Sequence, residues 1–307
     1  MTKLEKLLKL KKEKNAIILA HSYVVPEIVR CVADYVGDSY GLSKQAKNTT
    51  ADTIIFSAVK FMAETAKLLN PSKNVYIPGT FNGCSLADSI TNHDIKQLKK
   101  KYPNYVFMCY INTTAAVKAE CDVCVTSSNV YDIAEKIDSN YIYFLPDKLM
   151  GKNLINELKR RNCHKTVRYW DGSCYVHEEY NPEMIDYVRL KHPNISVLAH
   201  PECSPEIVDR ADYTGSTSQI INHVKDTNHD SYFLLTECGL TSRLQTEIPN
   251  KKFVGTCTMC KYMKANSLDN IEAVLKNPTE TQNITIDTET QQKAIHCIEQ
   301  MFELTES

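Results

Sequence analysis

The feature that most restricts the fold of this chain is a pattern that occurs three times, at an interval of about 90 residues. In its clearest copy, at 184–203, a helical pattern closes at Pro193-Asn194, an apolar run follows at 195–199, and His200-Pro201-Glu202 ends the run. Similar copies lie at 95–112 and 4–23, where Tyr110 and His21 replace His200. Self-similarity at this period indicates repeated small domains, because the interval is too long for a solenoid unit.

The apolar runs in these copies predict buried strands between helical segments, which is typical of parallel α/β structure. We therefore predict an α/β fold of three homologous α/β/α repeats, each with a short parallel sheet, in a pseudo-threefold arrangement around a central site. The expected boundaries are 1–92, 93–178 and 179–267. The C-terminal helical patterns at 268–307 are assigned to the first repeat, with the helices packing back across the body.

A second recurring feature joins an aspartate to a hydroxyl five residues later. The pairs are Asp52 with Ser57, Asp122 with Ser127, and Asp212 with Thr217. On this register the first repeat holds an extra loop, since His21 and Asp52 are 31 residues apart (52 − 21) and the later intervals are 12 (122 − 110 and 212 − 200). Each hydroxyl opens a helical pattern whose free N–H groups favour an anion, although N-capping is the commoner role.

Composition excludes several classes of protein. With 36 basic and 37 acidic residues the net charge is −1, so neither nucleic acid nor an acidic membrane surface is an expected partner. There is no apolar run long enough to span a membrane, and the N-terminal segment lacks the apolar core of a signal peptide. We expect a cytoplasmic protein. Twelve cysteines scattered through 307 residues favour metal binding over a disulfide scaffold.

Each repeat ends in a glycine-containing loop with a cysteine, and the three are Cys84, Cys174 and Cys260. Equivalent loops meet near the axis of a threefold arrangement, so three thiolates would converge there. These three cysteines are widely separated in the sequence and do not pair with one another in the compact C-x-x-C manner of a zinc finger, which favours an iron–sulfur cluster over structural zinc. A cubane on three sulfurs leaves one iron open as a Lewis acid. Five other cysteines are interpreted as small core residues: Cys31, Cys109, Cys121, Cys124 and Cys163.

The strand ends are the second candidate site. Ligands of open parallel sheets bind outside the carboxyl ends of the strands, which is where His21 and His200 fall. A titratable pair such as His200 and Glu202 in that position indicates function more strongly than a chance surface loop does.

These residues resemble the quinolinate synthase family along nearly the whole chain. The stretches that carry the resemblance are 19–23 with Pro26-Glu27, Gly37-Asp38-Ser39, 61–67, 83–88, Tyr110-Ile111-Asn112, Val125-Thr126-Ser127, 174–177, 200–203, 215–219 and Thr236-Glu237. The resemblance implies a triplicated α/β fold with an oxygen-sensitive 4Fe–4S cluster held by one cysteine of each unit. It also implies the condensation of iminosuccinate with dihydroxyacetone phosphate to quinolinate in NAD biosynthesis, with loss of phosphate and two waters. L-aspartate oxidase is the expected supplier of iminosuccinate.

The resemblance further implies roles for individual residues. Those expected to hold the substrates and the developing ring are His21, Ser39, Tyr110, Asn112, Ser127, His200, Glu202, Ser216 and Thr217. Those expected to act in catalysis are Tyr23 and Glu202 as proton carriers, with His200, Tyr110 and, near the cluster, His177. Cys260 is assigned as the third ligand because Cys260-Lys261-Tyr262-Met263 matches the family pattern of a ligand cysteine followed by methionine at the third position.

Three alternatives stay open at this point. Some members of the family carry a third cysteine in this run, whereas here only Cys257 accompanies Cys260, either as a partner in a redox-sensitive disulfide or as the ligand in its place. A different iron–sulfur hydro-lyase would share the cluster but not the surroundings of Tyr110 and Ser127. A thiol-based redox sensor would need only the cysteines.

Overall fold

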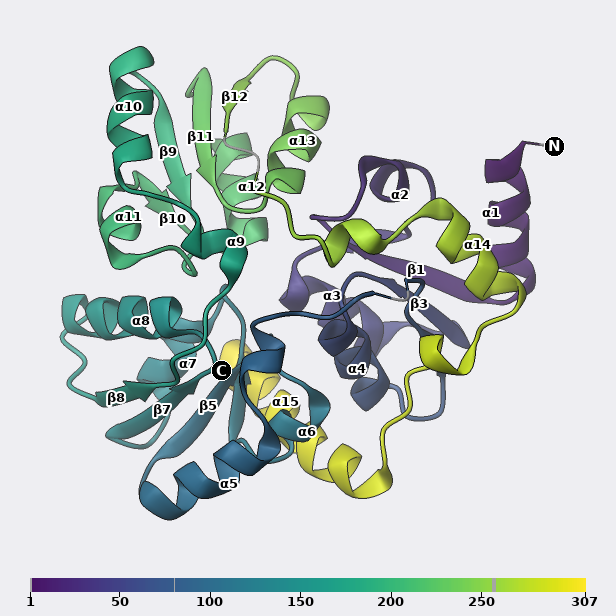
Figure 1. The fold of residues 1–307 in the computed structure, drawn as a ribbon, viewed down its shortest axis with the longest axis horizontal. Helices are drawn as coiled ribbons and strands as arrows, with labels where there is room; N and C mark the ends of the chain where they lie inside the picture. The colour runs from purple at the N-terminus through teal and green to yellow at the C-terminus, as the bar shows by residue number, and fades with distance from the viewer. Residues whose placement is uncertain (1, 80, 256–257) are drawn as a thin grey trace.

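The structure, a computed structural model, describes residues 2–79, 81–255 and 258–307, and it contains three four-stranded sheets in which every described strand pair is parallel (Figure 1). The sheets share one order: β2-β1-β3-β4, β6-β5-β7-β8 and β10-β9-β11-β12. The strands are β1 (Ala16–His21), β2 (Tyr35–Gly37), β3 (Thr53–Ser57), β4 (Asn74–Tyr76), β5 (Val106–Tyr110), β6 (Val123–Val125), β7 (Tyr141–Leu145), β8 (Thr166–Tyr169), β9 (Ser196–Ala199), β10 (Tyr213–Thr214), β11 (Ser231–Leu235) and β12 (Lys252–Val254). The predicted fold class is confirmed.

Helices connect successive strands and cover the sheets (Figure 1). They are α1 (Lys3–Glu13), α2 (Pro26–Cys31), α3 (Ser39–Asn48), α4 (Lys60–Leu69), α5 (Asn92–Lys101), α6 (Ala115–Lys118), α7 (Val130–Lys136), α8 (Lys148–Arg160), α9 (Tyr175–Glu178), α10 (Glu183–Lys191), α11 (Pro205–Arg210), α12 (Thr217–Asp226), α13 (Cys238–Glu247), α14 (Leu268–Lys276) and α15 (Thr288–Glu306), with 3-10 turns η1 (Ala87–Ser89), η2 (Met263–Ala265) and η3 (Glu280–Gln282). Within the described ranges, no helix combines the length and the apolar character needed to cross a bilayer.

Sheet formation follows from burial of the central strands on both faces. Strands β1, β5, β9 and their neighbours β3, β7 and β11 are almost wholly buried, as is typical of parallel strands between helical layers. Side-chain caps begin many of the covering helices, with complete capping boxes at α1, α5 and α12. The chain therefore alternates short strands, of which the central ones are largely apolar, with helices that in many cases carry a side-chain cap.

The predicted register between the repeats is wrong in the first repeat. Asp34, not Asp52, is the equivalent of Asp122 and Asp212, because the three carboxylates accept the backbone N–H groups of Ile18, Phe107 and Val197 at 2.8, 2.7 and 2.8 Å. Five residues after Asp34 comes Ser39, just as Ser127 and Thr217 follow their aspartates.

Two further predictions depended on that register and are also wrong. The segment of 36–40 is no extra loop, since β2 and α3 occupy the positions of β6 with α7 and of β10 with α12. Ser57 is the last residue of β3, whereas the next helix begins at Lys60. With the correct aspartate the interval in the first repeat is 13 residues (34 − 21), against 12 in each later repeat, so no long insertion separates them.

The C-terminal helices lie against two of the three units. Helix α14 packs on α1, and the segment before α15 adds backbone hydrogen bonds between Ile284 N and Val75 O and between Ile77 N and Gln282 O. Helix α15 packs on β6, α6 and α7 of the second unit and also touches α4 of the first, in yellow at the foot of Figure 1. The boundaries given above for the three repeats stay a prediction.

Candidate active site

The central strands of the three sheets end at one enclosed cavity. His21 and Tyr110 are the last residues of β1 and β5, His200 follows β9, and all three side chains line the cavity. Its volume is about 60 Å³, roughly the space of two water molecules. Each of these side chains is at most 5% exposed, so the three units contribute buried groups at equivalent positions to one shared space.

Most of the residues predicted to bind substrate lie around this cavity. Those in its lining are His21, Ser39, Tyr110, Asn112, Ser127, His200, Glu202 and Thr217, together with Tyr23. Ser216 is not among the lining residues, and its Oγ donates to Asp38 Oδ2 at 3.1 Å. The lining also includes five residues without a predicted role: Asp38, Phe61, Met62, Thr126 and Met263.

The carboxylate of Asp38 lies at the start of α12, where the sequence predicted an anion site at Thr217. Its Oδ2 accepts from the Ser216 hydroxyl and from Ser218 N–H at 3.3 Å, at the N-terminus of α12. Its Oδ1 accepts from Gly41 N–H at 3.0 Å and so caps α3. The positive end of α12 thus contacts a carboxylate of the first unit, which links two repeats beside the cavity. Asp38 stands in one of the stretches that carry the family resemblance, and this was the signal that sequence reasoning left unused.

His21 is held as a neutral imidazole. Its Nδ1 accepts from the backbone N–H of Tyr23 at 3.2 Å, so the proton of the neutral ring lies on Nε2. Burial lowers the pKa of His21 to about 4, although the nearby Asp38 carboxylate opposes this effect. At neutral pH the ring can therefore donate one hydrogen bond without carrying a charge.

The buried histidine predicts a pH dependence of stability. In the unfolded chain His21 regains its ordinary pKa of 6.5, so below that pH the unfolded state binds more protons and the free energy of unfolding falls as pH falls. Between pH 7 and pH 5 the loss due to His21 amounts to about 2 kcal/mol. Urea denaturation at both pH values should show this loss in the unmutated chain and a smaller one, by about that amount, in His21→Gln. Equal losses in the two proteins would contradict a neutral buried His21.

Glu202 lies between two histidines of different units. Its Oε2 is 3.3 Å from His177 Nδ1 and 3.2 Å from His200 Nδ1, and the two imidazole rings stack at 4.8 Å between centroids. Burial raises the pKa of Glu202, but His177 and His200 outweigh burial and hold it below its ordinary value. Burial lowers the pKa of His177 to about 4. Both directions give an ionised carboxylate beside a neutral His177 at neutral pH.

The second carboxylate oxygen of Glu202 has no partner. Oε1 is buried and makes no hydrogen bond to any residue that the structure describes. An unpaired buried acceptor is costly in a folded protein, so such an atom indicates a position where a ligand or a substrate proton is received. The carboxylate is thus available as a base.

A hydrogen-bonded chain connects Tyr23 to His177, whose Nδ1 lies 3.3 Å from this carboxylate without a hydrogen bond to it. The Tyr23 hydroxyl is 2.8 Å from both Thr217 Oγ1 and Thr236 Oγ1, and Thr236 Oγ1 is 3.3 Å from His177 Nε2. Burial raises the pKa of Tyr23 well above its ordinary value, so the phenol keeps its proton. Thr236 had no predicted role. It directly follows β11, so its side chain lies at the carboxyl ends of the strands, as those of the predicted site residues do.

The three predicted cysteine ligands lie close to one another. The proximity of Cys260 adds to the rise that burial causes in the pKa of Cys84, and the proximity of Cys84 does the same for the pKa of Cys174. The loops are joined directly: the Tyr175 hydroxyl accepts from Lys261 N–H at 2.8 Å, and the rings of Phe81 and Tyr262 are 5.1 Å apart. The ligating atoms of Cys174, His177 and Glu202 all lie within 4.8 Å of one another. The cysteine loops therefore border the Glu202 site.

Each of these cysteines precedes a short helical turn whose backbone faces its sulfur. Cys84 accepts from the N–H groups of Ala87 and Leu86, Cys174 from that of His177, and Cys260 from those of Met263 and Tyr262. In all three the N–H of the third following residue points at the thiol, so the same local geometry occurs once in each unit. Backbone donors to sulfur are what cysteine ligands of iron–sulfur clusters use to tune the cluster. The donor set and its surroundings fit such a group.

The three thiols are half-buried, and their surroundings favour the neutral form, which a metal would change. Burial raises the pKa of Cys84 to about 12, and burial also raises that of Cys174 and Cys260. Cys260 is fixed further by Glu237, whose Oε1 accepts from Cys260 N–H and pairs with Lys264 Nζ, both at 3.1 Å. Cys257, predicted as disulfide partner or alternative ligand, lies outside the described residues.

Comparison with known proteins agrees with this geometry. The family model described as quinolinate synthetase A protein matches residues 5–303. The quinolinate synthase of Clostridium novyi is 44% identical over 301 residues, covering 98% of both chains, and that of Alkaliphilus metalliredigens is 39% identical over 303 residues with the same coverage. Quinolinate synthase 1 of Mesorhizobium japonicum is 41% identical over 299 residues, covering 97% of this chain and 90% of its own. This chain therefore belongs to the quinolinate synthetase A family.

Proposed function

We propose that the protein is a quinolinate synthase that condenses iminosuccinate with dihydroxyacetone phosphate, releasing phosphate and two waters. The observation that carries this proposal is the position of Glu202. Its carboxylate lines the cavity at the strand ends, and its charge acts on Cys84 and Cys174. A base and a metal-binding region thus share one wall, as a reaction that removes both a proton and a hydroxyl requires.

Cys84, Cys174 and Cys260 are proposed to hold a 4Fe–4S cluster with one iron free of protein sulfur. When bound, this cluster supplies a Lewis acid that can take up a leaving hydroxyl. Three thiolates would leave one of the four irons without a protein ligand, by count alone. The ligand atoms of Glu202 and His177 lie within 4.8 Å of that of Cys174, beside this region.

The remaining residues are proposed to bind and move protons. His21 offers a neutral N–H donor for a substrate carboxylate, and Ser39, Ser127 and Thr217 add hydroxyls around the cavity. Glu202 accepts the proton that the condensation releases through its unpaired Oε1. Tyr23, protonated because it is buried, donates its hydroxyl proton to the substrate and regains one from Glu202 by way of His177 and Thr236. Tyr110, Asn112 and His200 complete the lining that orients the ring carbons.

The site also bears on where the reaction runs and who supplies its substrate. Every cysteine that the structure describes is a free thiol, which supports a reducing compartment and hence the cytoplasm. Iminosuccinate hydrolyses in water, and we propose L-aspartate oxidase as its source.

The decisive experiment is an anaerobic assay. Protein purified without oxygen should hold about four irons and four labile sulfides per chain and form quinolinate from iminosuccinate and dihydroxyacetone phosphate. Iron and sulfide at that level without quinolinate would favour a different iron–sulfur hydro-lyase. Stoichiometric zinc without sulfide at these cysteines would overturn the cluster.

Replacing Tyr23 by phenylalanine tests the proton donor. The ring would keep its edge-to-face contact with His21, at 4.4 Å between centroids, while the hydroxyl that joins Thr217 and Thr236 is lost. We expect turnover to fall about a hundredfold, with the iron content unchanged. The matched control is Tyr187→Phe, because Tyr187 is 63% exposed on α10. A Tyr23→Phe variant as active as the control would remove Tyr23 from the mechanism.

A further inference from the structure

The turn that carries Glu202 is held by a side chain of a different unit. Asn153 lies on α8 of the second unit, and its Nδ2 donates to the carbonyl oxygens of Pro201 and Cys203, each at 2.8 Å. These two residues stand directly before and after Glu202 in the chain. The Asn153 amide therefore holds the backbone on both sides of the residue that we propose as the base.

Only one orientation of the Asn153 amide fits these contacts. Asn153 is 2% exposed, and its Oδ1 is buried without a hydrogen bond to any residue that the structure describes. Turning the amide over would place Oδ1 against two carbonyl oxygens, which are acceptors like Oδ1 itself. Both N–H groups of Nδ2 are thus directed at the turn.

The turn satisfies its own N–H groups but not these two carbonyl oxygens. Cys203 N donates to His200 O at 2.9 Å, and Glu202 N donates to His200 Nδ1 at 3.3 Å. The carbonyl oxygens of Pro201 and Cys203 accept from α8 instead. A buried carbonyl that loses its donor is costly in free energy, so removal of the amide would favour a displacement of the turn.

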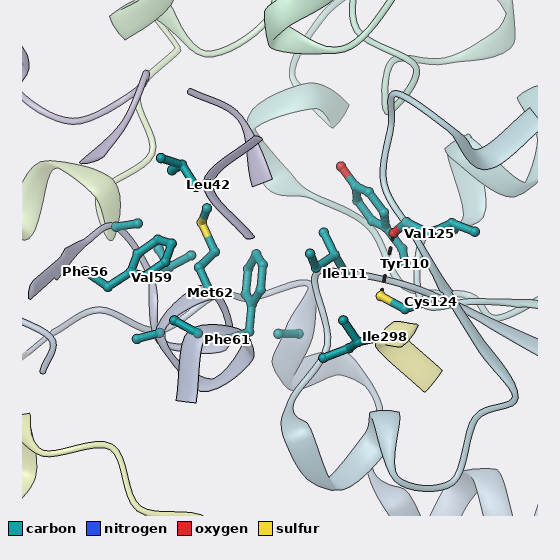
Figure 2. Packing of buried hydrophobic residues seen from close by; sticks show 14 of the residues in the cluster. Leu42, Phe56, Val59, Phe61, Met62, Tyr110, Ile111, Cys124, Val125 and Ile298 are labelled. Carbon is teal, nitrogen blue, oxygen red and sulfur yellow. Dashed lines mark hydrogen bonds between the residues drawn. The ribbon is translucent and has the colours of Figure 1, made fainter. Parts of the chain in front are cut away.

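The turn does not belong to the apolar cluster that joins the first and second units. Figure 2 shows part of that cluster, with Phe61 of α4 and Tyr110 of β5 among its members. Cys203 lies in a separate apolar cluster of the third unit. Beside Asn153 is a cavity of about 250 Å³, lined by polar side chains of both units such as Glu157 and Gln219. The position of the turn against α8 therefore depends on directional polar contacts.

A second polar contact between α8 and the third unit is weaker. Arg160 of α8 pairs with Asp209 of α11, and both side chains are about half exposed. Exposed ion pairs contribute little to stability because water screens them. The two hydrogen bonds of Asn153 are buried and are not screened in this way.

We propose that Asn153 is a positioning residue of the active site, which fixes the direction of the Glu202 carboxylate across the boundary between the second and third units. This inference rests on the proposed role of Glu202 as the base. Asn153 is not among the residues that line the catalytic cavity, so it acts through the turn and not on the substrate. Misplacing a catalytic group by about 1 Å costs on the order of a hundredfold in rate.

Replacing Asn153 by leucine tests the proposal, since leucine keeps the branched shape and removes both hydrogen bonds. We expect kcat to fall by about tenfold or more and KM to change by less than about threefold, because the base is misplaced while the other cavity residues remain. Asn70→Leu is the matched control. Asn70 is 6% exposed in the first unit, and its Nδ2 likewise donates to two carbonyl oxygens, of Ala46 at 2.8 Å and Ala66 at 3.1 Å. This control should keep both constants.

A double variant shows whether Asn153 acts through the carboxylate. In the Glu202→Gln background, where the base is already absent, Asn153→Leu should change the residual kcat by less than about twofold. A loss in that background as large as in the unmutated chain overturns the proposal, because Asn153 would then act independently of Glu202.

The thiol of Cys203 reports on the turn without any turnover. Cys203 is fully buried, and its Sγ donates to Leu235 O at 3.2 Å. A turn released from α8 opens locally more often, so Asn153→Leu should raise the rate of Cys203 alkylation by iodoacetamide about tenfold, measured by peptide mass spectrometry, whereas Asn70→Leu should leave it unchanged. If Asn153→Leu does not fold, Asn153→Ser takes its place, because the short serine side chain cannot reach both carbonyl oxygens.

The alkylation rates separate this proposal from the proposed function. Unmutated protein that forms no quinolinate would contradict the function, yet faster alkylation of Cys203 in the Asn153 variant would still support the contact that holds the turn. Equal alkylation rates in the unmutated chain and in the variants of Asn153 and Asn70 would contradict the role of Asn153 whether or not quinolinate forms.

Discussion

We expect that replacing Cys84, Cys174 or Cys260 by serine abolishes both iron binding and quinolinate formation. Each cysteine sits at the start of a short turn that directs backbone N–H groups at its sulfur. Serine keeps the turn but offers a hard oxygen, which is a poor ligand for an iron–sulfur cluster. With two sulfurs left, a cubane is not retained. Iron per chain, absorbance and turnover should therefore fall together, to less than about a tenth of the unmutated values.

Two further cysteine variants serve as controls. Cys31 was predicted to be a core residue, but this prediction is wrong because the thiol is exposed at the end of α2. Cys31→Ser should therefore keep iron and activity. Cys257→Ser should also keep both under anaerobic conditions, because the turn that positions a ligand sulfur follows Cys260. If Cys257→Ser is colourless and Cys260→Ser retains iron, the ligand assignment in the third unit is wrong, although the three-loop arrangement would survive.

Changing Glu202 to glutamine should remove turnover while the cluster remains. Glutamine has nearly the same shape, so the packing between His177 and His200 persists, but the amide cannot accept a proton as the carboxylate does. General bases contribute about a hundred- to ten-thousandfold to rate, and we expect a loss in that range. Turnover within threefold of the unmutated protein, with unchanged iron, would exclude Glu202 as the base.

A control variant with the same substitution at another site shows whether the effect is specific to Glu202. Glu183→Gln makes the same change at an exposed carboxylate of α10 and should leave turnover and iron unchanged. If iron is lost together with turnover in Glu202→Gln, the carboxylate supports the metal site rather than the proton transfer. Iron and turnover must therefore be measured on the same preparations.

Local sequence determined the fold class and much of the candidate site. Runs such as 195–199 are apolar apart from Ser196, as is typical of a strand buried on both faces. Because the carboxyl ends of parallel strands face one edge, His21, Tyr110 and His200 were predictable as neighbours once the repeats were recognised. The interval between Cys84 and Cys174 (174 − 84 = 90) equals the repeat period, so the loops that hold these cysteines were also predictable as neighbours.

The contacts between residues of different units became known only from the tertiary structure, because the spacing of residues in the sequence does not predict them. Asp34 and Asp52 both fit a repeated aspartate in the sequence, and only the hydrogen bond from Ile18 N–H to Asp34 identifies the equivalent residue. The contact of Asp38 with the start of α12 joins residues 178 positions apart, from Asp38 to Ser216. From the sequence alone, nothing relates Cys109 to Cys297. Their sulfur atoms are 3.5 Å apart because α15 packs against the second sheet. Sequence period fixes which elements form, because backbone geometry and burial act locally. Which side chains meet between units depends on packing, which joins residues that no local pattern relates.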